Sequence, residues 1–347
     1  MPRRVEARAP TRVDLAGGTV DLWPLYLLLD RPLTVNAAID LDANASIEIA
    51  AEPGWEIVSR DRGASGRVPA GASLQEALAA TPAGLSFITR LAHELLASGP
   101  PRSRPTALRI TTACRAPAGS GLGGSSALGI ALATALDRFA GTGLGADQIL
   151  HLTRAVETQV LAIPTGEQDY HPALHGGVLA LHYTVRGTRI ERLDVDTAAL
   201  RERILLLYTG VSRNSGISNW DIYKRYLDGD QVVRSSLQAI SDAAHQVRDA
   251  LIAGRWQEVG AGLADEWAAR RRLSPAVTDE RIDALIAGAC ETGASAGKVC
   301  GAGGGGCLVL WLPGDGVRGA VEGRMRSMGA EVLQFDLSAS GVQVTET

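Results

Sequence analysis

The clearest regular pattern in the chain is the alternation of apolar and polar residues over residues 39–49. The odd positions are apolar and the even positions are polar, which is typical of a β-strand with one buried face. Further strands are predicted at residues 108–112, 178–184, 204–208, 307–312 and 331–337. The chain therefore contains several short strands, separated by stretches with a different periodicity.

Those other stretches repeat their apolar residues at the spacing of an amphipathic helix. Residues 85–97 place Phe87, Ile88, Leu91 and Leu95 on one face and end before a Gly-Pro-Pro sequence. A further helix is expected to begin at Asp147, as N-cap, and to end at Leu161. Helices are also predicted at residues 128–139, 232–272, 279–292 and 317–328.

The order of these elements predicts the fold class and the domain organisation. Strands and helices are mixed without strict βαβ alternation, which favours an α+β fold. A polar stretch at residues 186–202 precedes an apolar strand and marks the expected boundary. We therefore expect one domain at residues 1–195 and a second at residues 196–347.

Composition narrows the classes of protein that fit. The 347 residues include 34 basic and 38 acidic side chains, for a net charge of -4, so charge gives no reason to expect nucleic acid or an anionic membrane as partner. The 4 cysteines have the spacing of neither a zinc site nor a disulfide framework. No signal region follows the basic first residues, and no apolar run could span a bilayer, so we expect a cytoplasmic protein.

The segment with the most chemical information is the glycine-rich stretch at residues 117–127, between a predicted strand and a predicted helix. Its glycines allow sharp turns and bring backbone N–H groups close to an anion, while the helix start adds unpaired N–H groups and the positive end of its dipole. Two serine hydroxyls can reach a phosphate or a magnesium ion. The residues expected to bind phosphate are Pro117, Gly119, Ser120, Gly121, Leu122, Gly123, Gly124, Ser125 and Ser126.

Other interpretations of this loop remain open from the residues alone. Gly119, Gly121 and Gly124 also fit the GxGxxG pattern of dinucleotide-binding proteins, but the acidic residue at the required distance, Asp137, lies inside the predicted helix. The chain has no GxxxxGK[ST] P-loop. A purely structural glycine turn is a third interpretation, which the four glycines and paired serines disfavour.

The stretch resembles the phosphate-binding motif of the GHMP kinases, and two other blocks support that resemblance. Residues 9–21 resemble the family's N-terminal substrate motif, and residues 298–306 resemble its C-terminal K-x-x-G-A-G-G-G-G motif. The resemblance implies ATP and Mg²⁺ as cofactors. It also implies an N-terminal α+β domain that carries the loop and a C-terminal domain with a ferredoxin-like core, with ATP bound between them.

The same resemblance implies roles for individual residues. Asp169 matches the catalytic aspartate that accepts the hydroxyl proton, and Arg12 matches a basic residue beside it. Glu157 matches the magnesium-binding glutamate, with Ser125 as a second ligand because Gly124 replaces the usual serine. The residues expected to contact substrate in these blocks are Asp21, Gly17, Gly18, Gly303 and Gly304.

One further stretch indicates a branch of the family. Residues 208–215 resemble the Y-T-G-x-x-R-x-S sequence of heptose and fucose kinases, which adds Thr209, Gly210 and Arg213 as substrate contacts. Arg213, Lys224, Arg225, Arg271 and Arg272 could together hold a sugar phosphate, although solvated surface charge explains Lys224 and Arg225 better.

The expected substrate is a sugar or sugar phosphate, with D-glycero-D-manno-heptose 7-phosphate first, and the expected state is a monomer or homodimer. Thr19-Val20 replaces the Gly-Thr of the heptose branch, which weakens that choice. Alternatives are another sugar, a less polar alcohol suggested by Trp23, Leu25 and Tyr26, or an inactive nucleotide or sugar sensor. ATP-dependent decarboxylation, found in one GHMP branch, is disfavoured by the sugar-type Asp21 motif.

Overall fold

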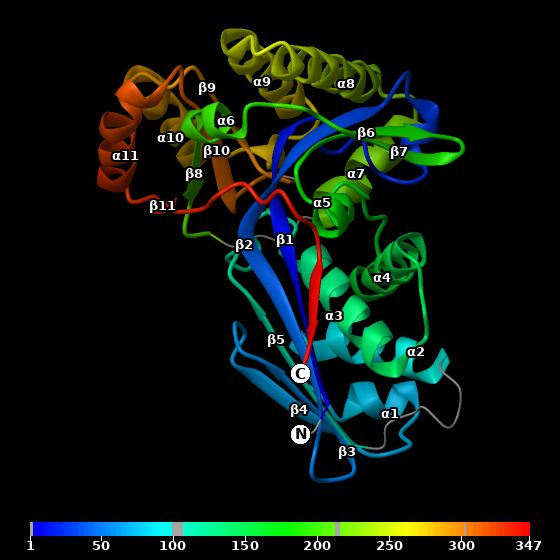
Figure 1. Ribbon diagram of the computed structural model, residues 1–347. Helices are drawn as coiled ribbons and strands as arrows, with labels where there is room; N and C mark the ends of the chain where they lie inside the picture. The colour runs from blue at the N-terminus through cyan, green and yellow to red at the C-terminus, as the bar shows by residue number, and fades with distance from the viewer. Residues whose placement is uncertain (1–2, 99–106, 212–215, 302) are drawn as a thin grey trace.

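Two β-sheets, each covered by helices, make up the computed structural model (Figure 1). The structure describes residues 3–98, 107–211, 216–301 and 303–347. The first sheet has the strand order β12-β1-β2-β5-β3-β4, with β6 pairing to β2 and β7 to β6. Its strands are β1 Arg4–Ala16, β2 Leu33–Ile49, β3 Gly54–Ser59, β4 Ala64–Val68, β5 Ala107–Cys114, β6 Val178–Thr184, β7 Gly187–Arg192 and β12 Gln343–Glu346.

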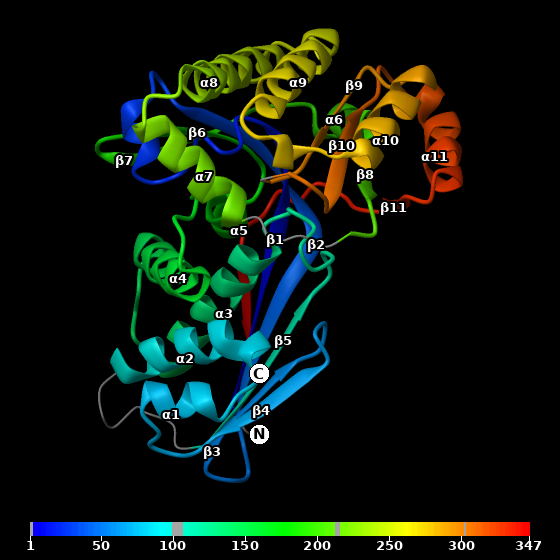
Figure 2. The same ribbon diagram turned by 180° about the vertical axis from the view of Figure 1, so that it is seen from behind.

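Helices cover one face of this sheet, and apolar side chains fill the space between. The core there joins residues of β1, β2 and β5 to residues of α2, α3 and α4. The helices and short 3₁₀ turns that belong to this half are η1 Leu25–Leu28, α1 Leu74–Ala79, η2 Ala83–Leu85, α2 Ser86–Ser98, α3 Gly124–Ala140, α4 Ala146–Leu161 and α5 Tyr170–His175. Figure 2 shows these helices stacked beside the sheet, with α3 nearest to β1.

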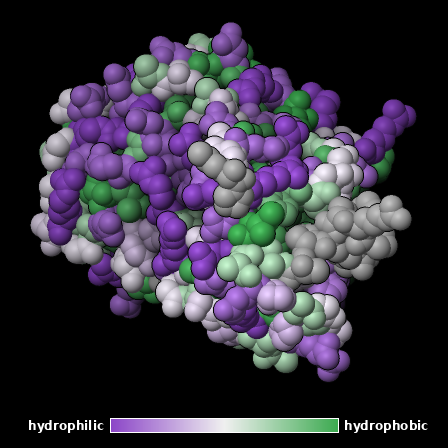
Figure 3. Space-filling view, turned by 60° about the horizontal axis from the view of Figure 1, so that its bottom comes forward, coloured by the Kyte–Doolittle hydropathy of each residue, from purple (hydrophilic) through white to green (hydrophobic). Residues whose placement is uncertain are grey.

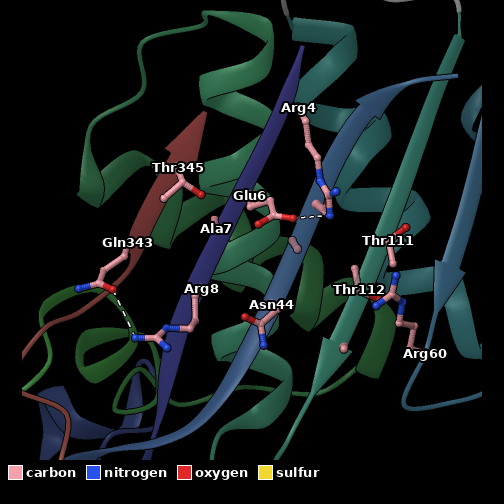
Figure 4. A pocket seen from close by; sticks show the side chains of 13 residues that line it. Arg4, Glu6, Ala7, Arg8, Asn44, Arg60, Thr111, Thr112, Gln343 and Thr345 are labelled. Atoms are coloured by element: carbon pink, nitrogen blue, oxygen red, sulfur yellow. Dashed lines mark hydrogen bonds and ion pairs between the residues drawn. The ribbon is translucent and has the colours of Figure 1, made fainter. Parts of the chain in front are cut away.

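The opposite face of the sheet is polar and open. Figure 4 shows Arg4, Glu6 and Arg8 of β1 standing beside Asn44 of β2 on this face. The alternation of exposed and buried residues at the start of β1 follows from this arrangement, because one face meets the helices and the other meets solvent. From Ala9 to Ala16 both faces of β1 are buried, since the second half of the molecule packs on that end.

The second sheet has the antiparallel order β11-β8-β10-β9. In the sequence β8, β9, β10 and β11 are the first to fourth strands of a βαββαβ unit, and across the sheet they lie in the order fourth, first, third, second, which is the ferredoxin-like arrangement that the resemblance implied. The elements of this half are α6 Thr197–Arg203, β8 Ile204–Tyr208, α7 Gly216–Leu227, α8 Gln231–Ile252, α9 Trp256–Arg271, η4 Pro275–Val277, α10 Glu280–Glu291, β9 Ala296–Val299, β10 Cys307–Trp311, η5 Asp315–Val317, α11 Arg318–Ser327 and β11 Glu331–Leu333.

The α+β fold class is therefore confirmed, but three predicted elements were wrong in detail. The single helix expected at residues 232–272 is two helices, because Gly254 adopts a left-handed conformation that ends α8. The N-cap of α4 is Gly145 and not Asp147, which lies in the first turn. The strand expected at residues 331–337 ends at Leu333, because the chain then crosses to the first sheet, where Leu337 bridges to Ile39.

The outer surface is predominantly hydrophilic in the view of Figure 3, where hydrophobic residues form small separate groups. Within the part of the chain that the structure describes, none of the helices combines the length and the apolar character that crossing a membrane requires. The predicted boundary at residues 195 and 196 falls between β7, in the first sheet, and β8, in the second. In the later part of the described chain, Leu337 bridges to Ile39 of the first sheet, and β12 joins that sheet as a strand beside β1.

Candidate active site

A cleft of about 140 Å³ lies where the end of β1, the start of α3 and the loop after α4 meet. Residues from all three sequence blocks and from the segment around Asp169 reach it. Its lining residues are Arg12, Thr19, Asp21, Leu22, Gly121, Ser126, Glu157, Leu161, Ile163, Pro164, Thr165, Gly166, Gln168, Asp169, Asn219 and Gly301. The cleft is therefore lined by polar groups and, on one side, by a few apolar side chains that include Leu161, Ile163 and Pro164.

Arg12 and Asp169 form the closest charged pair in the cleft. Arg12 donates to Asp169 Oδ1 from Nε at 2.8 Å and from Nη2 at 2.5 Å, and its Nη1 donates to the carbonyl of Gly121. The Arg12 side chain is 2% exposed, whereas that of Asp169 is 27% exposed. Burial alone would lower the pKa of Arg12, but the carboxylates of Asp169 and Asp14 outweigh it and raise that pKa. The arginine is thus a fixed cation that orients Asp169 and leaves part of its carboxylate open to the cleft.

Asp21 is the second carboxylate of the cleft and has a different environment. Its side chain is buried, and its Oδ2 accepts a hydrogen bond from the backbone N–H of Gln168 at 3.1 Å. A Cβ atom at Gly166 would lie 1.9 Å from the same oxygen, so only glycine allows this approach. Burial raises the pKa of Asp21 to about 6, and the Gln168 N–H opposes that rise.

Glu157 extends from the last turns of α4 toward the start of α3. Its carboxylate accepts hydrogen bonds from the hydroxyl of Ser126 at 3.0 Å and from the hydroxyl of Tyr170. Burial raises the pKa of Glu157, and hydrogen bonds from Tyr170 and Ser125 oppose that rise. The Glu157 carboxylate therefore interacts with Ser125 and Ser126 of the loop and with Tyr170.

The glycine-rich loop has the shape expected of an anion site. Gly119, Gly121 and Gly123 all have positive φ angles, and Gly123 is the N-cap of α3 without any side-chain cap. The first N–H groups of α3 thus have no capping side chain and lie at the positive end of the helix dipole. A Cβ atom at Gly121 would lie 2.4 Å from the carbonyl oxygen of Cys300. The loop therefore packs directly against the third sequence block.

A buried network of charges lies behind the cleft and was missed by sequence reasoning. Arg270 Nη2 contacts Asp14 Oδ2 at 3.1 Å and Glu266 Oε1 at 2.5 Å, and Lys298 Nζ contacts Asp14 Oδ1 at 3.2 Å and Glu266 Oε1 at 3.0 Å. All four side chains are at most 1% exposed. Arg270 also donates from Nη1 to the carbonyl of Gly301 in the third block. The network thus ties β1 to α9 and β9.

The sequence contains signals for this network, but each signal is weak by itself and becomes informative only in combination with the others. Asp14 is two residues after Arg12 and so lies on the same face of β1. Glu266 and Arg270 have the i, i+4 spacing of a helical ion pair. Burial would raise the pKa of Asp14, but Lys298 and Arg270 outweigh burial and hold that pKa below its usual value.

Comparison of the chain with protein-family models identifies its family. The family model "GHMP kinases N terminal domain" matches residues 86–177, and the model "GHMP kinases C terminal" matches residues 247–331. Together the two matches span just over half of the chain. The chain belongs to the GHMP kinases.

Curated relatives of this GHMP kinase include sugar kinases. The chain is 28% identical over 322 residues to the bifunctional fucokinase/GDP-fucose pyrophosphorylase of Arabidopsis thaliana. This alignment covers 89% of this chain and 30% of that protein. It is 25% identical over 244 residues to the D-glycero-alpha-D-manno-heptose 7-phosphate kinase of Campylobacter jejuni, covering 69% of this chain and 71% of that protein. The chain thus spans less than a third of the fucokinase relative's length.

Solved structures show the same GHMP kinase fold. A D-glycero-D-manno-heptose 1-phosphate kinase from Bacteroides thetaiotaomicron superposes with a TM-score of 0.77 at 21% identity, covering 98% of both chains. Lactococcus lactis galactokinase, solved with galactose, gives a TM-score of 0.78 at 16% identity over 98% of this chain and 95% of that one. At these identities the superpositions establish the fold.

The predicted site residues of this GHMP kinase fall into two groups. The cleft brings together Arg12, Asp21, Gly121, Glu157 and Asp169, as expected for residues that act together. Ser126 also lines the cleft, and Ser125 reaches Glu157. Ser120 and Leu122 hold the loop in place, because their carbonyls accept from the N–H groups of Cys307 and Arg12.

Other predicted substrate contacts lie behind the cleft wall. Gly17 and Gly18 pack against the backbone at Leu33 and against Arg270, and Thr209 donates to the carbonyl of Gly306. None of these residues, nor Gly210, Gly303 or Gly304, lines the cleft in the described part of the chain. Arg213 lies outside the described residues, and direct substrate contacts by all of them stay predictions.

The expected cofactors fit the residues that are present. Glu157, Ser125 and Ser126 supply oxygen donors, which Mg²⁺ prefers, beside the uncapped start of α3. Among the described residues no group of three His, Cys, Asp or Glu side chains could hold a metal ion. That fits a magnesium ion that is bound by one carboxylate together with phosphate oxygens and water.

Proposed function

We propose that the protein transfers the γ-phosphoryl group of ATP to a hydroxyl group of a sugar or sugar phosphate. The observation that carries this proposal is the meeting of Asp169, fixed by Arg12, with Asp21 and Glu157 in one cleft beside the glycine-rich loop. Phosphoryl transfer needs positioning, charge neutralisation and a group that receives the hydroxyl proton, and these residues offer all three.

Each residue has one task in the proposed reaction. The bound magnesium nucleotide supplies the phosphoryl group. The N–H groups at the start of α3 bind its phosphates, and Glu157 with Ser125 holds the metal ion. Asp21 accepts hydrogen bonds from the acceptor's hydroxyls and thereby orients it. Asp169 receives the proton of the reacting hydroxyl, while Arg12 stabilises the charge that develops there.

The first candidate acceptor is D-glycero-D-manno-heptose 7-phosphate, phosphorylated at its 1-hydroxyl. The Campylobacter relative and residues 208–215 support this choice. The described members of the basic cluster proposed from the sequence, Lys224, Arg225, Arg271 and Arg272, give it no support, and Arg213 lies outside the described residues. Lys224 pairs with Asp228, Arg225 with Asp230 and Arg271 with Asp283, and none of them lines the cleft.

A second candidate is an uncharged sugar of the fucose type. The relative that covers 89% of this chain carries a fucokinase activity in its name. No lysine lines the cleft in the described part of the chain, and Arg12, the arginine there, is already paired with Asp169. A free sugar therefore fits the charges of the described residues better than a sugar phosphate does.

The test is magnesium-dependent ATP consumption with a panel of acceptors, with products identified by mass spectrometry. The panel contains heptose 7-phosphate, free heptoses, fucose, mannose, galactose and arabinose. Asp169→Asn should lower kcat by roughly 10²- to 10⁴-fold, the range typical of a lost general base, and leave the Kd for ATP unchanged. Asp315→Asn, an exposed carboxylate in η5, is the matched control.

The outcomes separate the alternatives. One efficient acceptor that depends on Asp169 supports the proposal and selects the candidate. ATP binding without turnover of any acceptor would favour a nucleotide or sugar sensor. Unchanged kcat in Asp169→Asn would remove Asp169 from the role of proton acceptor.

A further inference from the structure

A second hollow adjoins the cleft. This groove has a volume of about 830 Å³ and lies between α4, α7 and the segment that follows β1. Figures 1 and 2 both show α7 between α8 and α4. Ile163, Pro164 and Thr165 line both the groove and the catalytic cleft. The cleft and the groove therefore adjoin along this three-residue segment.

The groove is predominantly apolar and aromatic. Eight of its twelve lining residues are apolar or aromatic: Trp23, Pro24, Ala155, Ala162, Ile163, Pro164, Trp220 and Tyr223. Trp23 and Trp220 are 53% and 51% exposed, although large aromatic side chains are usually buried. The rings of Trp220 and Tyr223 stack with centroids 5.9 Å apart. Exposed aromatic side chains in a concave site are typical of ligand recognition.

The polar residues of the groove already have partners. Arg154 forms an ion pair with Glu167, and its Nη2 lies 3.4 Å from His151 Nδ1. The hydroxyls of Thr158 and Thr165 hydrogen-bond each other at 2.9 Å. The one arginine that lines the described groove is thus neutralised, and the lining contains no lysine. A phosphate group would find no uncompensated cation among these side chains.

We infer that the groove binds an uncharged apolar or planar group on the acceptor, attached to the part that presents its hydroxyl to Asp169. The inference rests on the proposed kinase function and narrows its substrate to hydroxyl compounds with such a group. Adjacency to the cleft selects this occupant, because Ile163 and Pro164 line both hollows and the groove beyond them contains the two exposed tryptophans. Leu161, which lines the cleft and is 42% exposed, adds a further apolar side chain to this lining.

The test uses matched pairs of sugar ethers. D-Mannose and D-galactose are each converted to monobenzyl and monomethyl ethers at O2, O3, O4 or O6, with the anomeric hydroxyl free. Affinity is measured by calorimetry without nucleotide, so that it does not depend on turnover. Burying a phenyl ring against the tryptophans should make at least one benzyl ether bind about tenfold tighter than its methyl partner.

Variants locate the effect. Trp220→Ala and Trp23→Ala should abolish the benzyl preference and leave the affinity for the methyl ether and for ATP unchanged. Both side chains are about half exposed, so their loss is not expected to unfold the protein. Leu227→Ala is the control, because Leu227 is exposed on the same helix and does not line the groove. Analytical ultracentrifugation of wild type and Trp220→Ala accompanies these titrations.

Failure of the inference and failure of the proposed function give different results. Phosphorylation of a sugar with no benzyl preference in any pair would overturn the groove assignment alone. A benzyl preference that Trp220→Ala removes, without ATP-dependent phosphorylation of any acceptor, would support the groove and refute the kinase reaction. A dimer that Trp220→Ala dissociates would show that a second copy of the chain occupies the groove, and would overturn the inference.

Discussion

Two carboxylates share the cleft, and their surroundings assign them different tasks. Asp169 is partly exposed and shares two hydrogen bonds with Arg12, so a fixed cation faces it at neutral pH. Asp21 is buried, has no cation as partner in the described ion pairs, and accepts a backbone N–H instead. When two acidic groups of one site have such different environments, they commonly have different roles. Asp21 suits hydrogen bonding to the acceptor, and Asp169 suits receiving its proton.

The raised pKa of Asp21 predicts an acid limb in the pH profile. Because burial raises this pKa to about 6, Asp21 becomes protonated below about pH 6 and then accepts hydrogen bonds from hydroxyls poorly. We expect kcat/KM for the acceptor to fall below pH 6, while the Kd for ATP stays constant. Asp21→Asn should lower kcat/KM and remove this limb. A limb that persists in Asp21→Asn would assign it to another group, with Glu157 next to be tested.

The raised pKa of Asp21 also makes the stability of the fold depend on pH. A carboxyl whose pKa is higher in the folded state than in the unfolded state stabilises the fold most below its unfolded pKa, near 4. This stabilisation is lost as the pH rises through 6. The ionised Asp21 that the proposed binding role requires is therefore a destabilising feature at neutral pH, as expected if the residue is kept for function.

At the scale of elements, the buried network explains why the third sequence block lies where it does. Arg270 of α9 holds the carbonyl of Gly301, while Lys298 of β9 and Asp14 of β1 complete the charges. The carbonyl of Cys300, one residue before Gly301, lies against Gly121 of the phosphate loop. Arg270 is therefore a positioning residue, which reaches the nucleotide site only through the backbone of the third block.

Removing this arginine should affect both stability and nucleotide binding. Arg270→Leu leaves Asp14 and Glu266 buried with one cation fewer, and losses of about 3–5 kcal/mol are typical of such changes. We expect a lower free energy of unfolding in urea and a higher Kd for ATP. Arg271→Leu is the matched control, because its exposed pair with Asp283 should contribute less than about 1 kcal/mol.

A conservative change separates positioning from folding. Arg270→Lys keeps the buried charge but loses the planar fork that spans Asp14, Glu266 and Gly301. It should recover part of the unfolding free energy and less of the ATP affinity. Equal recovery of both quantities would show that Arg270 acts through stability alone.

The elements also show what the sequence could and could not reveal. The period-two pattern located residues 39–49 of β2, where most polar positions are less buried than the apolar ones, but not residues 33–38, which are buried on both faces. The helical pattern located α2, whose apolar residues face the core. The break between α8 and α9 was missed because apolar residues continue on both sides of Gly254. The Asp14, Glu266, Arg270 and Lys298 network was missed because charged residues from three distant segments become neighbours only through tertiary packing.

At the scale of the whole molecule, the long strands β1 and β2 both contribute to the cores of the two halves. The first part of β1 belongs to the core beneath α3, and its last part belongs to the core shared with α8, α9 and the second sheet. Arg12 and Asp14 lie in that last part, so the strand brings Arg12 and the buried network to the junction. The boundary at residues 195 and 196 stays a prediction, because β12 lies after it and pairs with β1 of the first sheet, and one core contains residues from both sides of it.

The last strand supports the first part of β1, and this support can be tested. β12 pairs with the outer edge of β1 from Val5 to Arg8, and the N–H groups of Arg4 and Thr347 bond each other's carbonyls at 2.9 and 3.0 Å. Deleting residues 343–347 would leave that edge unpaired, at roughly 1 kcal/mol for each lost hydrogen bond. We expect the free energy of unfolding to fall by roughly 2–4 kcal/mol and self-association to increase, with kcat near wild type at low temperature because β2 still fixes Arg12. Glu346→Gln, which removes only the ion pairs to Arg3 and Arg138, should cost less than about 1 kcal/mol. If the shortened chain has the same urea midpoint of unfolding as the wild type, β12 does not contribute to stability. β1 would then be held by β2 and by the two cores alone.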